Sequence, residues 1–191
     1  METQLKPTLW RTARALANKD RLNLMRLVST AKGAKGVVEL AAEAKLPVPT
    51  ASLYLRALNA RGLISVVRSG PYVFYGTGSD RSLPVAVRIQ STFRRLFATE
   101  PLPDDWIRDL LPTLRAYSNA RRESIVRLLH TCQPVRYAEF KGLSGLHETS
   151  FLRHLDILIA AGIIVHDRDG FYSIARPPNP LAAEFLKAAS S

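Results

Sequence analysis

The chain has 191 residues, of which 47% are apolar, and this is enough for one or two domains with hydrophobic cores. Its formal net charge of +11 favours a polyanionic partner, either nucleic acid or an anionic membrane surface. No apolar run reaches the roughly 18 residues of a membrane span, and the N-terminus lacks a secretory apolar region, so we expect a cytoplasmic protein with no segment in a membrane.

The N-terminal part of the chain predicts a series of short helices. Residues 9–17 form the first, and Asn18 precedes a second with the sequence RLNLMRLVS. After a loop rich in Gly and Lys at residues 31–36, the apolar pattern of residues 38–44 predicts a third. Pro49 suits the start of a fourth helix, because the N–H that proline lacks would have no partner there.

The stretch 50–75 joins this fourth helix to a hairpin. Gly62 ends the helix, residues 69–71 (Ser-Gly-Pro) form a turn, and the apolar runs on either side of the turn predict two strands. A helix followed by such a hairpin, or wing, is typical of the C-terminal half of a winged helix-turn-helix, whose recognition helix enters the major groove of DNA. Its inward side is indicated by the helical spacing of Ala51, Ser52, Leu55 and Leu58.

The second half of the chain repeats the first. Residues 15–28 align with residues 116–129 at an offset of 101, and residues 55–64 align with residues 155–164 at an offset of 100. A hairpin follows the second copy too, with its turn at residues 167–170. We therefore expect two units of the same kind.

An amphipathic helix follows each predicted hairpin, at residues 84–97 and 180–189. Each can bury its apolar face against its twin and the first helix of each unit. Asp104 and Asp105 are placed to begin the helix that contains Trp106. The sequence predicts a mainly α protein with small β-wings, in which two winged helix-turn-helix units lie in tandem, related by a pseudo-twofold axis. The expected parts are unit 1–98, linker 99–105 and unit 106–191.

Both units carry motifs of a known family. They are ALANKDRLNLMRLV and VVELAAEAKLPVPTASLYLRALNARGLI in the first unit, and NARRESIVRLL and SFLRHLDILIAAGII in the second. In these motifs the chain resembles the ArsR-type winged-helix transcriptional repressors. Members are typically homodimers that bind near-palindromic operators and release them on sensing a signal. The resemblance implies a fused, monomeric pseudo-dimer, and association of two chains into a homodimer stays open.

The metal-sensing positions of that family are not filled. Where its metal sensors carry a cysteine pair, this chain has VVELAAEAK and VRYAEFK, and residues 84–97 contain no histidine or acid. The spacing of the four histidines does not suit a zinc site within one element, and the single cysteine, Cys132, most simply packs as a small buried apolar side chain. No P-loop, GxSxG or HExxH motif is present. We expect no metal, no cofactor and no catalysis.

The candidate DNA contacts lie on the outward faces of the two recognition helices. Leu53 could contact only a thymine methyl group, whereas Arg153 is the best candidate for guanine, a pairing worth roughly 1–3 kcal/mol of discrimination. We expect His147 and His154 to face solvent or the groove. The predicted DNA-binding residues are Thr50, Ser52, Tyr54, Arg56 and Arg68 in the first unit and His147, Thr149, Ser150, Arg153, His154 and Arg168 in the second.

Charge favours the first unit as the stronger phosphate binder. Residues 1–80 hold 12 Lys and Arg against 5 Asp and Glu, whereas residues 112–191 hold 10 against 7. We expect a sequence-specific regulator that binds double-stranded DNA with two unequal half-sites. The alternatives are a winged-helix module for protein interaction or replication initiation, to which Leu53 and Ile157 would be suited, and arginines on the helices that are merely solvated.

Overall fold

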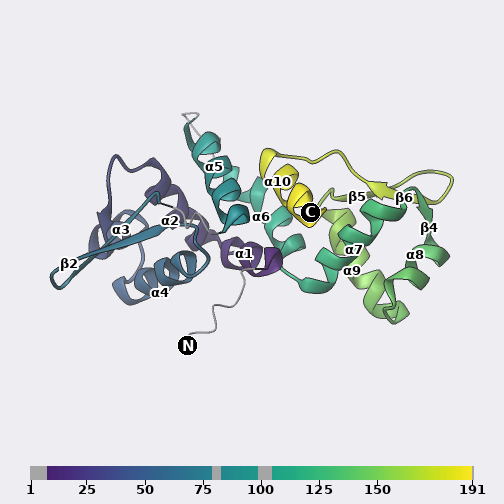
Figure 1. Cartoon of the computed structure of the whole chain (residues 1–191), viewed down its shortest axis with the longest axis horizontal. Helices are drawn as coiled ribbons and strands as arrows, with labels where there is room; N and C mark the ends of the chain where they lie inside the picture. Colours follow the sequence, from purple (N-terminus) through teal and green to yellow (C-terminus); the bar gives the residue numbers. More distant parts are fainter. Residues whose placement is uncertain (1–7, 79–82, 99–104, 191) are drawn as a thin grey trace.

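The computed structural model describes residues 8–78, 83–98 and 105–190, which form ten helices and two three-stranded antiparallel sheets (Figure 1). The first half contains α1 (Leu9–Leu16), α2 (Lys19–Thr30), β1 (Lys35–Gly36), α3 (Val37–Glu43), α4 (Val48–Asn59), β2 (Ser65–Ser69), β3 (Tyr72–Gly76) and α5 (Pro84–Ala98). The second contains α6 (Trp106–Tyr117), α7 (Ala120–Cys132), β4 (Val135–Arg136), α8 (Tyr137–Ser144), α9 (Glu148–Ala160), β5 (Ile164–His166), β6 (Phe171–Ile174) and α10 (Pro180–Ala189). The predicted mainly helical content with small β elements is confirmed.

The two halves have the same order of elements, and α2 and α7 begin with the same contacts. The side chain of Asn18 accepts two first-turn N–H groups at 3.0 Å each, and that of Asn119 accepts two at 2.9 and 3.3 Å. The Arg21 guanidinium donates to carbonyls at the end of α1, and that of Arg122 donates to those at the end of α6. These contacts pair backbone groups that a helix end leaves free.

Helices α4 and α9 also end alike. Gly62 and Gly162 both have φ of 66°, and the N–H of the following residue donates to the carbonyl of Leu58 (3.2 Å) or Leu158 (3.0 Å). This is the Schellman arrangement, which favours glycine because the left-handed region strains a side chain. The predicted role of Gly62 as the end of the helix is confirmed.

Each sheet has one strand more than the predicted hairpin. The strand order is β1-β3-β2 in one sheet and β4-β6-β5 in the other. The additional strands are only two residues long. Strand β1 lies where the sequence indicated a Gly- and Lys-rich loop, and no strand was predicted at β4. Lys35 pairs with Tyr75, and Val135 pairs with Tyr172. The predicted hairpins are confirmed, because β2 pairs with β3 and β5 pairs with β6, and a short third strand that we did not predict joins each pair.

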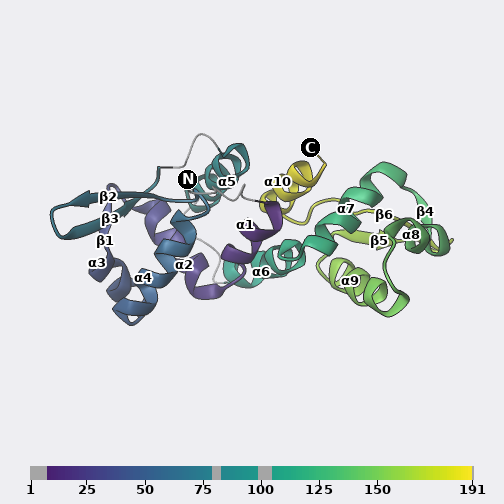
Figure 2. The same cartoon turned by 60° about the horizontal axis from the view of Figure 1, so that its bottom comes forward.

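The halves meet at the centre of the molecule, where α1 packs against α6 and α5 packs against α10 (Figures 1 and 2). Thr12 and Thr113 are buried at equivalent places in α1 and α6. Arg88 and Glu184, each the fifth residue of its helix, approach to 3.9 Å between Nε and Oε2. Two identical chains would put like charges at this place, whereas one chain with two different halves puts opposite charges there.

The predicted linker lies mostly outside the described residues, because Asp104 and residues 99–103 are not among them. Asp105 stands directly before α6, but its side chain makes no capping hydrogen bond and instead pairs with Arg108. Across the described ranges, none of the helices combines the length and the apolar character needed to cross a bilayer.

Candidate nucleic-acid interface

Helices α4 and α9 lie along the same side of the molecule, near its two ends (Figure 2). Each follows a short helix, α3 or α8, and precedes the outer strands of a sheet. The sequence places these helices by burying one stripe of each. The buried residues are Ala51, Leu55 and Leu58 in α4 and Phe151, His154, Leu155 and Leu158 in α9.

The outward face of α4 agrees with the prediction at Leu53 and Arg56, both of which are exposed. Thr50 and Ser52 are half-buried at the edge of this face. Tyr54 does not belong to it. Its ring packs against the core, and the Arg21 guanidinium of α2 lies 5.4 Å from the ring centroid. Tyr54 therefore helps to hold α4 against α2, and a contact of its hydroxyl to DNA stays a prediction.

The outward face of α9 presents Arg153 and Thr149, which are exposed, while Ser150 is half-buried. His147 is exposed and stands directly before the helix without a capping bond. Glu148 accepts a hydrogen bond from the Tyr137 hydroxyl, and this bond raises the pKa of Tyr137 to about 12. With Asp156 exposed on the same helix, the face of α9 carries both signs of charge.

His154 faces the interior of the protein, and its prediction as a solvent- or groove-facing residue is wrong. Its exposed fraction is 5%, and neither ring nitrogen has a hydrogen-bond partner. Burial lowers the pKa of His154, and the charges of Arg122, Arg153 and Arg121 lower it further. The sequence held the signal, because Phe151, His154, Leu155 and Leu158 follow the i, i+3, i+4, i+7 spacing of a buried stripe.

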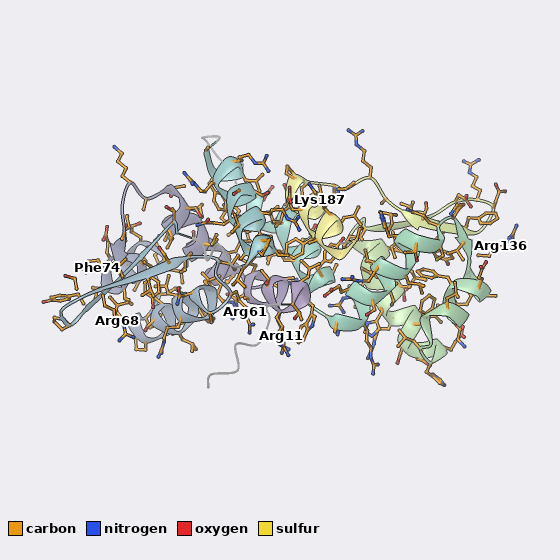
Figure 3. The ribbon with its side chains drawn as sticks, viewed as in Figure 1. Arg11, Arg61, Arg68, Phe74, Arg136 and Lys187 are labelled. Carbon is orange, nitrogen blue, oxygen red and sulfur yellow. The ribbon has the colours of Figure 1, made fainter. Side chains whose placement is uncertain are left out.

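The two hairpins differ in length and charge. Arg68 is exposed on β2, a five-residue strand, and it lies toward the outer end of the first hairpin (Figure 3). Arg168 is exposed in the turn between β5 and β6. The Asp167 carboxylate holds that turn by accepting the N–H groups of Asp169 and Phe171 at 3.0 and 2.9 Å. Both arginines are accessible to phosphates, but the second stands beside acidic groups, as expected.

Two cations outside the predicted set of DNA-binding residues lie on the same side as α4. Figure 3 shows Arg61, after the end of α4, and Arg11, on α1, pointing to the lower side of the molecule, as does Arg68. The Arg11 guanidinium lies 5.0 Å from the Trp10 ring centroid. The helical wheel of α4 already places Arg61 on the outward face. Arg11 could not be placed from the sequence, because only the packing of α1 between the halves brings it to this side.

Acidic side chains near the first half are largely paired. Lys35 forms ion pairs with Glu39, at 3.2 Å, and with Glu43, and its single positive charge offsets part of the repulsion that these two carboxylates exert on a phosphate backbone. Within the described part of the chain, no group of three or more His, Cys, Asp and Glu side chains could hold a metal ion. Cys132 is half-buried against the core rather than buried, and burial raises the pKa of its thiol.

Comparison with protein-family models, curated proteins and solved structures found no match to this chain. The function must therefore be inferred from the interface itself, which has two outward helix faces, two arginine-bearing hairpins and further arginines on one side of the molecule.

Proposed function

We propose that the chain is a tandem winged helix-turn-helix protein of the ArsR type that binds double-stranded DNA sequence-specifically and regulates transcription in the cytoplasm, most simply as a repressor. The observation that carries this proposal is the placement of α4 and α9, with their outward faces, on one side of a protein of net charge +11. Helices on the surface of winged units enter the major groove, where base edges can be distinguished.

The candidate residues divide into two kinds of contact. The exposed Arg68 and Arg168 and the half-buried Arg11 and Arg61 are suited to phosphates, which position a protein on the duplex without reading sequence. Arg56 and Arg153, on the recognition helices, are suited to base edges, and Thr50, Ser52, Thr149, Ser150 and His147 supply neutral polar groups beside them. This division assigns positioning to the wings and to the centre, and base reading to α4 and α9.

A single chain already supplies the contacts that a dimer would make. The pairing of α1 with α6 and of α5 with α10 supports a pseudo-twofold relation, and the opposite charges of Arg88 and Glu184 favour this intramolecular pairing over a symmetric one. We therefore propose that one chain binds one duplex as a pseudo-dimer. Because the two recognition faces differ, the half-sites should form an imperfect palindrome with centres about one helical turn apart.

A protein-docking role is the second candidate, and exposed apolar side chains favour it. Val38, Leu53 and Ile157 project from α3, α4 and α9. A winged-helix module of a replication-initiation or interaction complex would use such a surface to hold another protein. The docking role makes no use of the arginines that border α4, and for this reason we place it second.

Salt dependence separates these candidates. Binding of a fluorescent duplex pool would be followed by anisotropy between about 50 and 200 mM salt; a protein with 6–10 phosphate contacts loses about 10³–10⁵ in affinity over this range. Arg68→Ala should reduce the slope of log K against log salt by about 0.9. Arg94→Ala is the matched control, because Arg94 is exposed on α5, away from α4 and α9. Feeble binding throughout, or equal slopes for both variants, would contradict the proposal.

A further inference from the structure

The surface around the start of α4 is unusually apolar for a basic protein. A groove of about 790 Å³ is bordered by the first turns of α3 and α4 and by β3. Val38 beside this groove is 70% exposed and Tyr72 is 67% exposed. Farther along α4, Leu53 is 57% exposed. Scattered apolar residues need no explanation, but several here border one groove, and Val48 and Pro49 of α4 line it.

At two positions of α4, the second half has a charged side chain where the first half has an exposed apolar one. At the offset of 100, Val48 corresponds to Glu148, and Leu53 corresponds to Arg153. The side chains of Glu148 and Arg153 are exposed, as are those of Val48 and Leu53. The two recognition helices thus share a backbone arrangement, including their glycine-terminated ends, but at these two places α4 presents apolar side chains and α9 presents charged ones.

We propose that the first half reads the 5-methyl groups of thymine through Val48, Pro49 and Leu53, so that its half-site is rich in A·T pairs. This inference rests on the proposed DNA binding. The thymine methyl is the one apolar group that a base pair presents in the major groove. Side chains with no donor or acceptor gain affinity there only by removing apolar surface from water.

The charges around this face favour DNA over a protein as its occupant. Arg56 on α4 and Arg68 on β2 are exposed in the same half, and Arg61 follows the end of α4. Residues 1–80 carry 12 basic against 5 acidic side chains. Cations that border an apolar face suit a duplex, which places phosphates on both sides of a groove lined by base edges.

Replacement of thymine by uracil tests the inference, because uracil pairs with adenine and lacks only the 5-methyl group. A duplex enriched by the protein from a random pool would be compared with the same duplex carrying uracil in one half-site at a time. We expect about fourfold weaker binding for each contacted methyl that is removed, in one half-site only. In Leu53→Ala the thymine duplex should bind more weakly, and the difference between thymine and uracil should shrink.

A gain-of-specificity variant gives a second readout. Leu53→Arg places an arginine at the position that corresponds to Arg153 in the second half. When duplexes are selected from a random pool with this variant, the first half-site should shift from A·T pairs toward guanine. Because Leu53 is exposed, the variant should fold, and a changed motif then reports a change in base contacts. Equal affinity for thymine and uracil in both half-sites, or an unchanged motif with Leu53→Arg, would overturn the inference and assign the apolar face to a protein partner. Failure to bind any duplex would instead overturn the proposed function as well.

Discussion

The buried histidine of α9 should make the protein less stable in mild acid. His154 is 5% exposed, and both ring nitrogens lack hydrogen-bond partners. Burial, followed by the charges of Arg122, Arg153 and Arg121, lowers its pKa in the folded state below the ordinary value of 6.5. Between the two pKa values the unfolded chain binds a proton that the folded chain does not, so acid favours unfolding.

His154→Leu should raise the free energy of unfolding and remove part of its pH dependence. An unpaired buried polar group costs about 1–3 kcal/mol, so we expect a gain of this size at about pH 8. The contribution of the neutral histidine is fully present above about pH 6.5 and is lost as the pH falls through the folded-state pKa. The advantage of His154→Leu should therefore widen between about pH 8 and about pH 5.

Urea unfolding followed by circular dichroism measures both effects, and the unfolding slope shows whether the compactness of either state has changed. The matched control is His147→Asn, because His147 is exposed at the start of the same helix. A loss of stability in His154→Leu at about pH 8, or an acid-induced fall as steep as that of the parent, would refute the reasoning.

Two further predictions concern contacts at helix ends and are checked by the same unfolding assay. Gly145→Ala should lower the free energy of unfolding by about 1–2 kcal/mol, because Gly145 has φ of 63°, in the left-handed region that strains a side chain. The control is Gly142→Ala, inside α8 and with open space around it, which should raise the free energy of unfolding by about 0.4–1 kcal/mol. Arg122→Ala should lower the free energy of unfolding by about 1.5–3 kcal/mol, because the guanidinium donates to two α6 carbonyls at 2.6 Å. Its control is Arg121→Ala, at an exposed position, which should change the free energy of unfolding by less than about 0.5 kcal/mol. Equal effects of the two members of either pair would contradict the assignment of these contacts.

Much of the helical arrangement could be predicted because its signals are local. The predicted trailing helix at residues 180–189 has the bounds of α10, and Asn18 caps α2 with its side chain. The repeat also carried information, since the left-handed residue after α3 is Lys45, with φ of 55°, where the second half has Gly145. Lysine gives no turn signal there, and only the equivalent glycine does.

The remaining features depend on contacts between distant residues. Strands β1 and β4 are two residues long and exist only because they pair with β3 and β6, about 40 residues later in the chain. Arg11 reaches the proposed interface only through the packing of α1 at the centre. His154 is different, because its periodicity indicated burial, and its polar chemistry was given too much weight. A polar residue in a buried stripe should be interpreted by its spacing first.

Selection of duplexes from a random DNA pool at about 150 mM salt tests the central claim most directly, with Arg56→Ala and Arg153→Ala beside the parent. DNA binding by both halves predicts an enriched imperfect palindrome with half-site centres about one helical turn apart. Arg153→Ala should relax the sequence preference in one half-site, and Arg56→Ala should relax it in the other. If no motif is enriched and binding stays weak, a sequence-reading regulator is contradicted.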